Sequence, residues 1–149
     1  MSGLIQENCI LFDMKGEKEQ IIRTLTECLY KAGKVEDAKG FYQDVLEREK
    51  ISPTYIGYDM GLPHGKTDRV LEPGVCFGRM ETPVVWNEQT GEKADLAILI
   101  AVPAEEAGNT HMKILASLSR RLMHESFRES LRISDRGQVY RILKEVLEG

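Results

Sequence analysis

The chain has 149 residues, of which 42% are hydrophobic and 30% are charged, and its formal net charge is −4 at pH 7. These values are typical of one soluble globular domain over residues 1–149, and they exclude a general electrostatic attraction to nucleic acid or to an anionic membrane. The chain has no basic and apolar leader, no apolar run longer than residues 96–102 and three cysteines without paired spacing. This pattern predicts a cytoplasmic protein without signal peptide, membrane insertion, disulfide framework or zinc site.

The first half of the chain predicts one strand, two helices and an extended segment. Apolar residues recur at helical spacing in two stretches, and Gly33 and Pro53 stand where these stretches end. Asp37 lies near the first turn of the second helix. The expected bounds are a strand at residues 9–12, helices at residues 18–32 and 36–52, and an extended segment at residues 55–62.

The second half predicts strands followed by helices. Residues 94–102 are nearly all aliphatic, which is typical of a central strand buried on both faces. Around it we expect strands at residues 70–80 and 83–86 joined by turns, a hairpin loop at residues 87–93, a long helix capped by Asn109 or Thr110, a short helix through residues 127–131 and a last helix over residues 139–146. The order predicts an α/β (α+β) fold, with a small mixed sheet covered by helices on both faces.

His64 is the first candidate functional residue, because it stands between Pro63 and Gly65. Pro63 fixes its own φ and favours an extended Leu62, while Gly65 removes a side chain beside the ring. A histidine held in this way suits metal ligation or nucleophilic attack on phosphorus, or it is a turn histidine without chemistry. No histidine or carboxylate spacing typical of a metal site occurs, so we expect no metal and no cofactor.

His111 and Arg48 are the other two candidates. His111 falls at the first or second position of the long helix, where unpaired backbone N–H groups form an anion site and disfavour a charged imidazole. Arg48 offers a planar fork of donors suited to phosphate oxygens. The alternatives are a surface histidine at a helix start and an arginine on a solvated helix face. His124 is interpreted as structural or exposed, and Cys76 as a core residue of a strand and not a nucleophile.

Several separated motifs resemble one family. They are residues 46–54 (Leu-Glu-Arg-Glu-Lys-Ile-Ser-Pro-Thr), Gly57, residues 62–66 (Leu-Pro-His-Gly-Lys), residues 101–103 (Ala-Val-Pro) and residues 111–119 (His-Met-Lys-Ile-Leu-Ala-Ser-Leu-Ser). In order and spacing they are similar to the enzyme IIA domain of the bacterial sugar phosphotransferase system, in its mannitol/fructose-type branch. The resemblance extends from about residue 9 to residue 147.

This resemblance implies a phosphotransferase with a phosphohistidine intermediate and a three-layer α/β/α fold. The residue matching His64 accepts a phosphoryl group from the histidine-phosphocarrier protein and passes it to a cysteine of enzyme IIB, while membrane enzyme IIC handles the sugar. His111 and Arg48 match residues beside the phosphorylated ring. No cysteine motif typical of IIB follows, so we expect IIB to be a separate chain.

Two other functions remain open at this stage. The nitrogen-related branch of the family controls partner proteins through its phosphorylation state, although residues 55–57 and 69–71 favour the transport branch. A scaffold of the same fold without phosphoryl chemistry is the third interpretation, and the presence of both His64 and His111 disfavours it.

Overall fold

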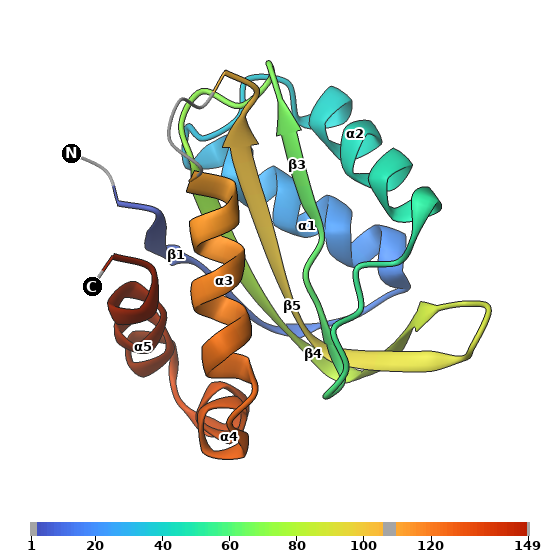
Figure 1. Cartoon of the computed structure of the whole chain (residues 1–149), viewed down its shortest axis with the longest axis vertical. Helices are drawn as coiled ribbons and strands as arrows, with labels where there is room; N and C mark the ends of the chain where they lie inside the picture. Colours follow the sequence, from blue (N-terminus) through green and yellow to red (C-terminus); the bar gives the residue numbers. More distant parts are fainter. Residues whose placement is uncertain (1–2, 106–109, 149) are drawn as a thin grey trace.

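A computed structural model of the protein describes residues 3–105 and 110–148, without the side chains of residues 110 and 111 (Figure 1). Its centre is a five-stranded mixed sheet in the order β1-β4-β5-β2, with β3 also paired to β5. β4 runs antiparallel to β5, whereas β1 is parallel to β4 and both β2 and β3 are parallel to β5. The strands are β1 (Ile5–Met14), β2 (Met60–Gly61), β3 (His64–Thr67), β4 (Gly74–Asn87) and β5 (Glu92–Pro103).

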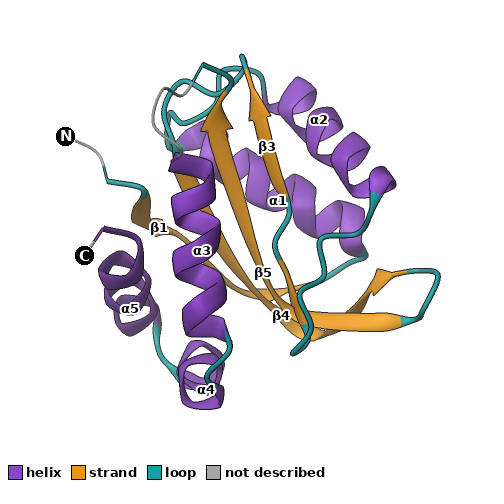
Figure 2. Cartoon of the chain, viewed as in Figure 1, coloured by secondary structure: helices purple, strands orange, loops and turns teal. Residues whose placement is uncertain are grey.

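Helices cover both faces of the sheet (Figure 2). α1 (Lys18–Lys31) and α2 (Ala38–Ile51) pack on one face, and α3 (Thr110–Leu122) and α5 (Arg136–Glu148) on the other, with α4 (Glu125–Ile133) beside α3. Each interface holds its own apolar core, because side chains along a strand alternate between the two faces. The three-layer α/β/α fold with a small mixed sheet is therefore confirmed. Within the described residues, none of the helices is both long enough and apolar enough to cross a bilayer.

The helix bounds agree closely with the sequence. Asp37 caps α2, since its Oδ1 accepts a hydrogen bond from the Gly40 backbone N–H at 3.0 Å. Gly33 follows α1 with a φ of +79°, the left-handed conformation that glycine adopts without strain. The central strand is confirmed as β5, whose residues 96–102 are fully buried. The expected cap of α3 at Asn109 lies outside the described residues.

Several segments differ from expectation. The strand expected from residue 70 begins at Gly74, and residues 64–67 form β3, a strand that was not expected. Residues 74–87 form one long strand, not two strands joined by a turn, because both parts pair with β5 across an irregularity between Arg79 and Val84. Pro83 lies in that irregularity, where a missing N–H removes no ladder hydrogen bond. Residues 55–62 are not continuously extended either. Gly57, Tyr58 and Asp59 all have positive φ and make a tight turn before β2.

Candidate functional site

His64 lies at a break in the edge of the sheet. β2 and β3 lie one after the other along β5, Met60 opposite Leu96 and His64 opposite Ile100. Between them Pro63 interrupts the strand, although its carbonyl still accepts a hydrogen bond from the Ile100 N–H at 3.0 Å. The backbone on both sides of the break is held by β5, so the His64 side chain projects from a fixed position as the first residue of β3.

The orientation of the His64 ring follows from its contact with the backbone. Its Nδ1 lies 3.0 Å from the Leu62 carbonyl oxygen. A carbonyl only accepts hydrogen bonds, so Nδ1 is the donor, and in the neutral ring Nε2 then carries the lone pair. The ring is half-buried. Pro63 therefore interrupts the strand and allows the His64 ring to turn back toward Leu62.

Gly65 allows α2 to approach this strand closely. A Cβ on Gly65 would lie 2.9 Å from Cε1 of Phe41 and 3.3 Å from Cγ2 of Val45, both on α2. The 2.9 Å contact is shorter than relaxed carbon atoms allow and the 3.3 Å contact is tight, so a side chain at this position would force Phe41 or α2 to shift. The Pro-His-Gly sequence thus positions the histidine and also brings a helix against it, as the ribbons of α2 and β3 show (Figure 1).

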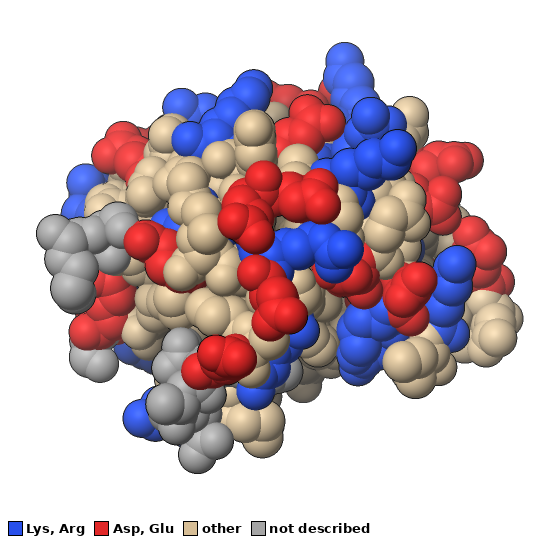
Figure 3. All heavy atoms as spheres, turned by 90° about the horizontal axis from the view of Figure 1, so that it is seen from above, with Lys and Arg blue, Asp and Glu red and all other residues tan. Residues whose placement is uncertain are grey.

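A cavity of about 600 Å³ lies where α2 meets β3. His64 and Arg48 both line it, so two of the three residues suggested by the sequence share one cavity. Both acidic and basic side chains line it, and they are also mixed over the end of the molecule at which β3 and β5 end (Figure 3). The lining residues are Asp44, Glu47, Arg48, His64, Gly65, Lys66, Thr67, Asp68, Arg69 and Ala104.

The cations of this cavity differ in how they are held. Arg69 is tied to Asp44 at 2.8 Å and to Asp37 at 3.2 Å, and hydrogen bonds to these carboxylates raise its pKa. Arg48 is half-buried in the last turn of α2, where its Nη1 donates to the Ser52 carbonyl at 2.9 Å. That bond fixes the direction of the guanidinium, which has five N–H groups to donate. Arg48 therefore combines a fixed position with donor capacity for an anion.

The sequence interpretation did not single out the two other cationic residues that line the cavity, Lys66 and Arg69. They lie two and five residues after His64, and this closeness in sequence was the available signal. His111 is the second residue of α3, as expected, but its side chain lies outside the described residues. His124 is exposed at the N-cap of α4 without a side-chain capping bond, so of the two expected interpretations the exposed one applies.

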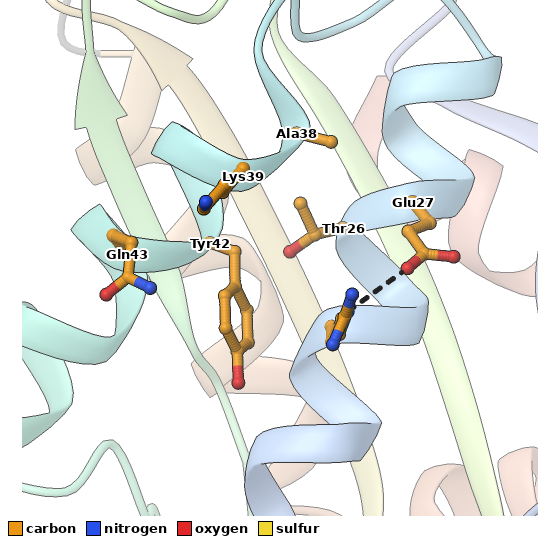
Figure 4. Close-up of a pocket in the computed structure, with 7 residues that line it drawn as sticks. Thr26, Glu27, Ala38, Lys39, Tyr42 and Gln43 are labelled. Atoms are coloured by element: carbon orange, nitrogen blue, oxygen red, sulfur yellow. Dashed lines mark ion pairs between the residues drawn. The ribbon is translucent and has the colours of Figure 1, made fainter.

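A second cavity, of about 350 Å³, lies between α1 and α2 (Figure 4). It shares no lining residue with the His64 cavity. Arg23 and Glu27 form an exposed ion pair of 3.4 Å at its edge, and Thr26 contributes a buried hydroxyl without a partner among the described residues. Neither a histidine nor a cysteine is among its lining residues.

Comparison with known families identifies the family of this chain. Residues 3–146 match the family described as "Phosphoenolpyruvate-dependent sugar phosphotransferase system, EIIA 2". The chain belongs to this family. The resemblance seen in the sequence is confirmed, and the protein is a phosphotransferase component of the kind that passes phosphoryl groups through histidine.

Relatives of this EIIA domain include transport and regulatory proteins. The fructose-specific EIIA component of Haloferax volcanii is 39% identical over 132 residues, 88% of this chain and 85% of that protein. Enzyme IIAMTL of Escherichia coli, solved in complex with phosphorylated enzyme IIBMTL, matches with a TM-score of 0.79 at 34% identity, over 94% of this chain and 98% of that one. Nitrogen regulatory protein IIA-Ntr of Neisseria meningitidis matches with a TM-score of 0.84 at 26% identity, over 94% of this chain and 96% of that one.

Other relatives are much longer proteins with several components. The chain spans only 15–18% of the length of multi-component phosphotransferase and multiphosphoryl transfer proteins that it matches. The match there is to one EIIA portion of a larger polypeptide.

Proposed function

We propose that the protein is a single EIIA domain over residues 1–149 that accepts a phosphoryl group on Nε2 of His64 and delivers it to a cysteine of enzyme IIB. The observation that carries this proposal is the 3.0 Å contact between His64 Nδ1 and the Leu62 carbonyl, inside a cavity that Arg48 also lines. The donor is the histidine-phosphocarrier protein, and the exchange occurs in the cytoplasm.

The Leu62 contact explains how one ring both accepts and releases the group. The Nε2 lone pair attacks phosphorus, and the bond from phosphorus to the donor imidazole breaks, its electron pair staying on the donor. The phosphorylated ring of His64 keeps its Nδ1 proton, hydrogen-bonded to the carbonyl oxygen. When a thiolate of IIB attacks phosphorus, the electron pair of the broken bond returns to Nε2. Neither step moves a proton at His64, so no general base is needed on this side.

Arg48 supports the transferred group electrostatically. Three equatorial oxygens carry the negative charge during transfer, and a charge-assisted guanidinium bond stabilises them. Its bond to Ser52 limits how far it follows the phosphate, which favours release over retention. For His111 the proposal rests on its position in the first turn of α3 and on the family match, and its role is to support the phosphoryl group without accepting it.

Two sources of support favour sugar uptake. Identity reaches 39% with the fructose-specific component and 34% with the mannitol enzyme, against 26% with the nitrogen-regulatory protein. A regulatory role is the second candidate, because the nitrogen-regulatory protein has the higher TM-score, 0.84 against 0.79. In the uptake role the membrane enzyme IIC acts further along, without direct contact with this domain.

The test is phosphoryl transfer from phosphoenolpyruvate through enzyme I and the histidine-phosphocarrier protein. Wild type should gain one acid-labile, base-stable phosphate, and His64→Ala should gain none. His124→Ala is the matched control, since it removes an exposed histidine outside the cavity. Labelling of His64→Ala at the wild-type level refutes the assignment. Transfer onward to a mannitol- or fructose-type IIB supports uptake, and phosphorylation without any such transfer supports the regulatory role.

A further inference from the structure

All three cysteines of the chain converge on one point of the fold. Cys9 lies in β1, Cys28 in α1 and Cys76 in β4, and each sulfur is within 4.8 Å of the other two. None of them is in a disulfide. None lines the His64 cavity, so phosphoryl transfer gives no reason for the cluster.

The sheet register places two of these sulfurs side by side. Ile10 of β1 pairs with Phe77 of β4, and both belong to the core under α3 and α5. Cys9 and Cys76 each precede this pair by one residue, so both point to the opposite face, toward α1. Cys28 approaches them from α1, which lies over β1 and β4. Three separate elements therefore present one thiol each to the same space.

The cluster has an opening to solvent on one side. Cys9 and Cys76 are buried, whereas Cys28 is only partly buried. The Cys28 thiol donates to the Asn8 carbonyl oxygen at 3.2 Å, and Asn8 itself is exposed. An ion that approaches past Asn8 meets Cys28 first and then reaches the two buried sulfurs. The arrangement thus offers both a ligand set and an entry path.

One partly exposed sulfur beside two buried sulfurs is a ligand set of the kind that soft cations prefer.

We propose that Cys9, Cys28 and Cys76 form a three-thiolate site for a thiophilic d¹⁰ metal ion, Cu(I) or Zn(II). Zn–S bonds of about 2.3 Å require sulfurs about 3.8 Å apart in tetrahedral geometry and about 4.0 Å apart in a trigonal plane. Sulfurs already within 4.8 Å reach that spacing by moving less than about 1 Å. Zn(II) takes a fourth ligand on the open side, the Asn8 carbonyl or a water, whereas Cu(I) is held by the three sulfurs alone.

Charge balance at the site is compatible with binding. The metal bonds to each sulfur, and every thiol still protonated releases its proton to solvent, so a divalent ion and three thiolates leave one net negative charge. The buried Lys34 contributes a positive charge to the surroundings of Cys9. Its ammonium bonds Glu72 Oε1 at 2.7 Å and the Gly3 carbonyl at 2.8 Å. Lys34 thus places a cation beside an anionic complex.

Binding is tested on the full chain, reduced and stripped of metal. Zn(II) and, under anaerobic conditions, Cu(I) are titrated separately against a competing chelator, and Cd(II) reports sulfur ligation through its thiolate-to-metal charge-transfer absorption. We expect one ion per chain, release of two or three protons, and a rise in Tm, because the metal joins β1, β4 and α1. Tight binding of one ion and not the other decides between Zn(II) and Cu(I).

Variants identify the ligands. Loss of an outer-shell partner alone costs about 10- to 100-fold in metal affinity, so Cys28→Ser should cost at least that much. Cys28 is only partly buried, so this variant should remain folded even if Cys76→Ala does not. His64→Ala and His124→Ala should bind metal like wild type. The proposal is overturned if the chain binds metal no more tightly than a simple thiol does, or if Cys28→Ser binds it as tightly as wild type. It is also overturned if the Cd(II) charge-transfer absorption corresponds to fewer than three sulfur ligands. A disulfide that forms on oxidation in a chain that binds no metal overturns it as well.

Discussion

A buried ion pair joins α2, the helix that carries Arg48, to α1. Glu49 lies on α2 and Lys18 on α1, with Nζ and Oε1 2.7 Å apart and the two side chains only 5% and 16% exposed. Glu49 also accepts hydrogen bonds from the backbone N–H of Thr54, at 3.1 Å, and from its hydroxyl. Thr54 begins the segment that leads to His64, so Glu49 joins two helices to the approach of the site. The perturbation we consider is Glu49→Gln.

The expected loss of stability is about 3 kcal/mol. Removing one partner of a buried ion pair costs about 3–5 kcal/mol, because the other charge is left without compensation. The value lies at the lower end here, since Lys18 still donates to the Trp86 carbonyl at 2.8 Å and lies 5.1 Å from the centre of that indole ring. The glutamine oxygen still accepts from the Thr54 N–H, whereas the new NH2 group cannot accept from the Thr54 hydroxyl as the second carboxylate oxygen does.

Urea unfolding with linear extrapolation measures the free energy of unfolding, provided that the m-values agree. The matched control is Glu81→Gln, which removes the same charge from an exposed pair: Lys15 and Glu81 are 77% and 49% exposed and 3.3 Å apart. Such pairs contribute about 0–1 kcal/mol. Adding Lys18→Met to Glu49→Gln should restore much of the loss, because the unpaired charge is then gone. The reasoning fails if Glu49→Gln and Glu81→Gln agree within about 0.5 kcal/mol, or if Lys18→Met restores nothing.

Three further predictions concern the transfer site. Arg48→Ala should slow phosphoryl transfer to and from His64 by about 5- to 150-fold, equivalent to about 1–3 kcal/mol, in rapid-quench assays. Unchanged rates would mean that Arg48 is a solvated surface residue without a role in transfer. Gly65→Ala should lower the free energy of unfolding by about 1–3 kcal/mol and slow transfer, since its Cβ would lie 2.9 Å from a Phe41 ring carbon. Wild-type stability and rates would mean that α2 shifts to make room without cost. His111→Ala should reduce delivery to IIB more than acceptance from the donor, with partial recovery in His111→Gln; equal rates in all three proteins would leave His111 without a role.

Local sequence determined most of the secondary structure. The helical spacing of apolar residues and the stop at Gly33 predicted α1, and Asp37 and Pro53 bracketed α2, because such signals act within one or two turns. The aliphatic run of β5 also predicted its strand from local sequence, because a strand buried on both faces needs apolar residues at nearly every position. The Pro-His-Gly motif also marked His64 without any tertiary information.

Pairing and packing decided the remainder. β4 is one strand because β5 pairs with both of its parts, and composition alone does not report a partner. Arg48 reaches the His64 cavity because Gly65 lets α2 come close, a contact between distant parts of the chain. Cys9, Cys28 and Cys76 lack any motif spacing, yet the register of β1 with β4 and the packing of α1 bring their sulfurs within 4.8 Å. Spacing rules detect ligands on one element, whereas these ligands come from three, so only the tertiary structure brings them together.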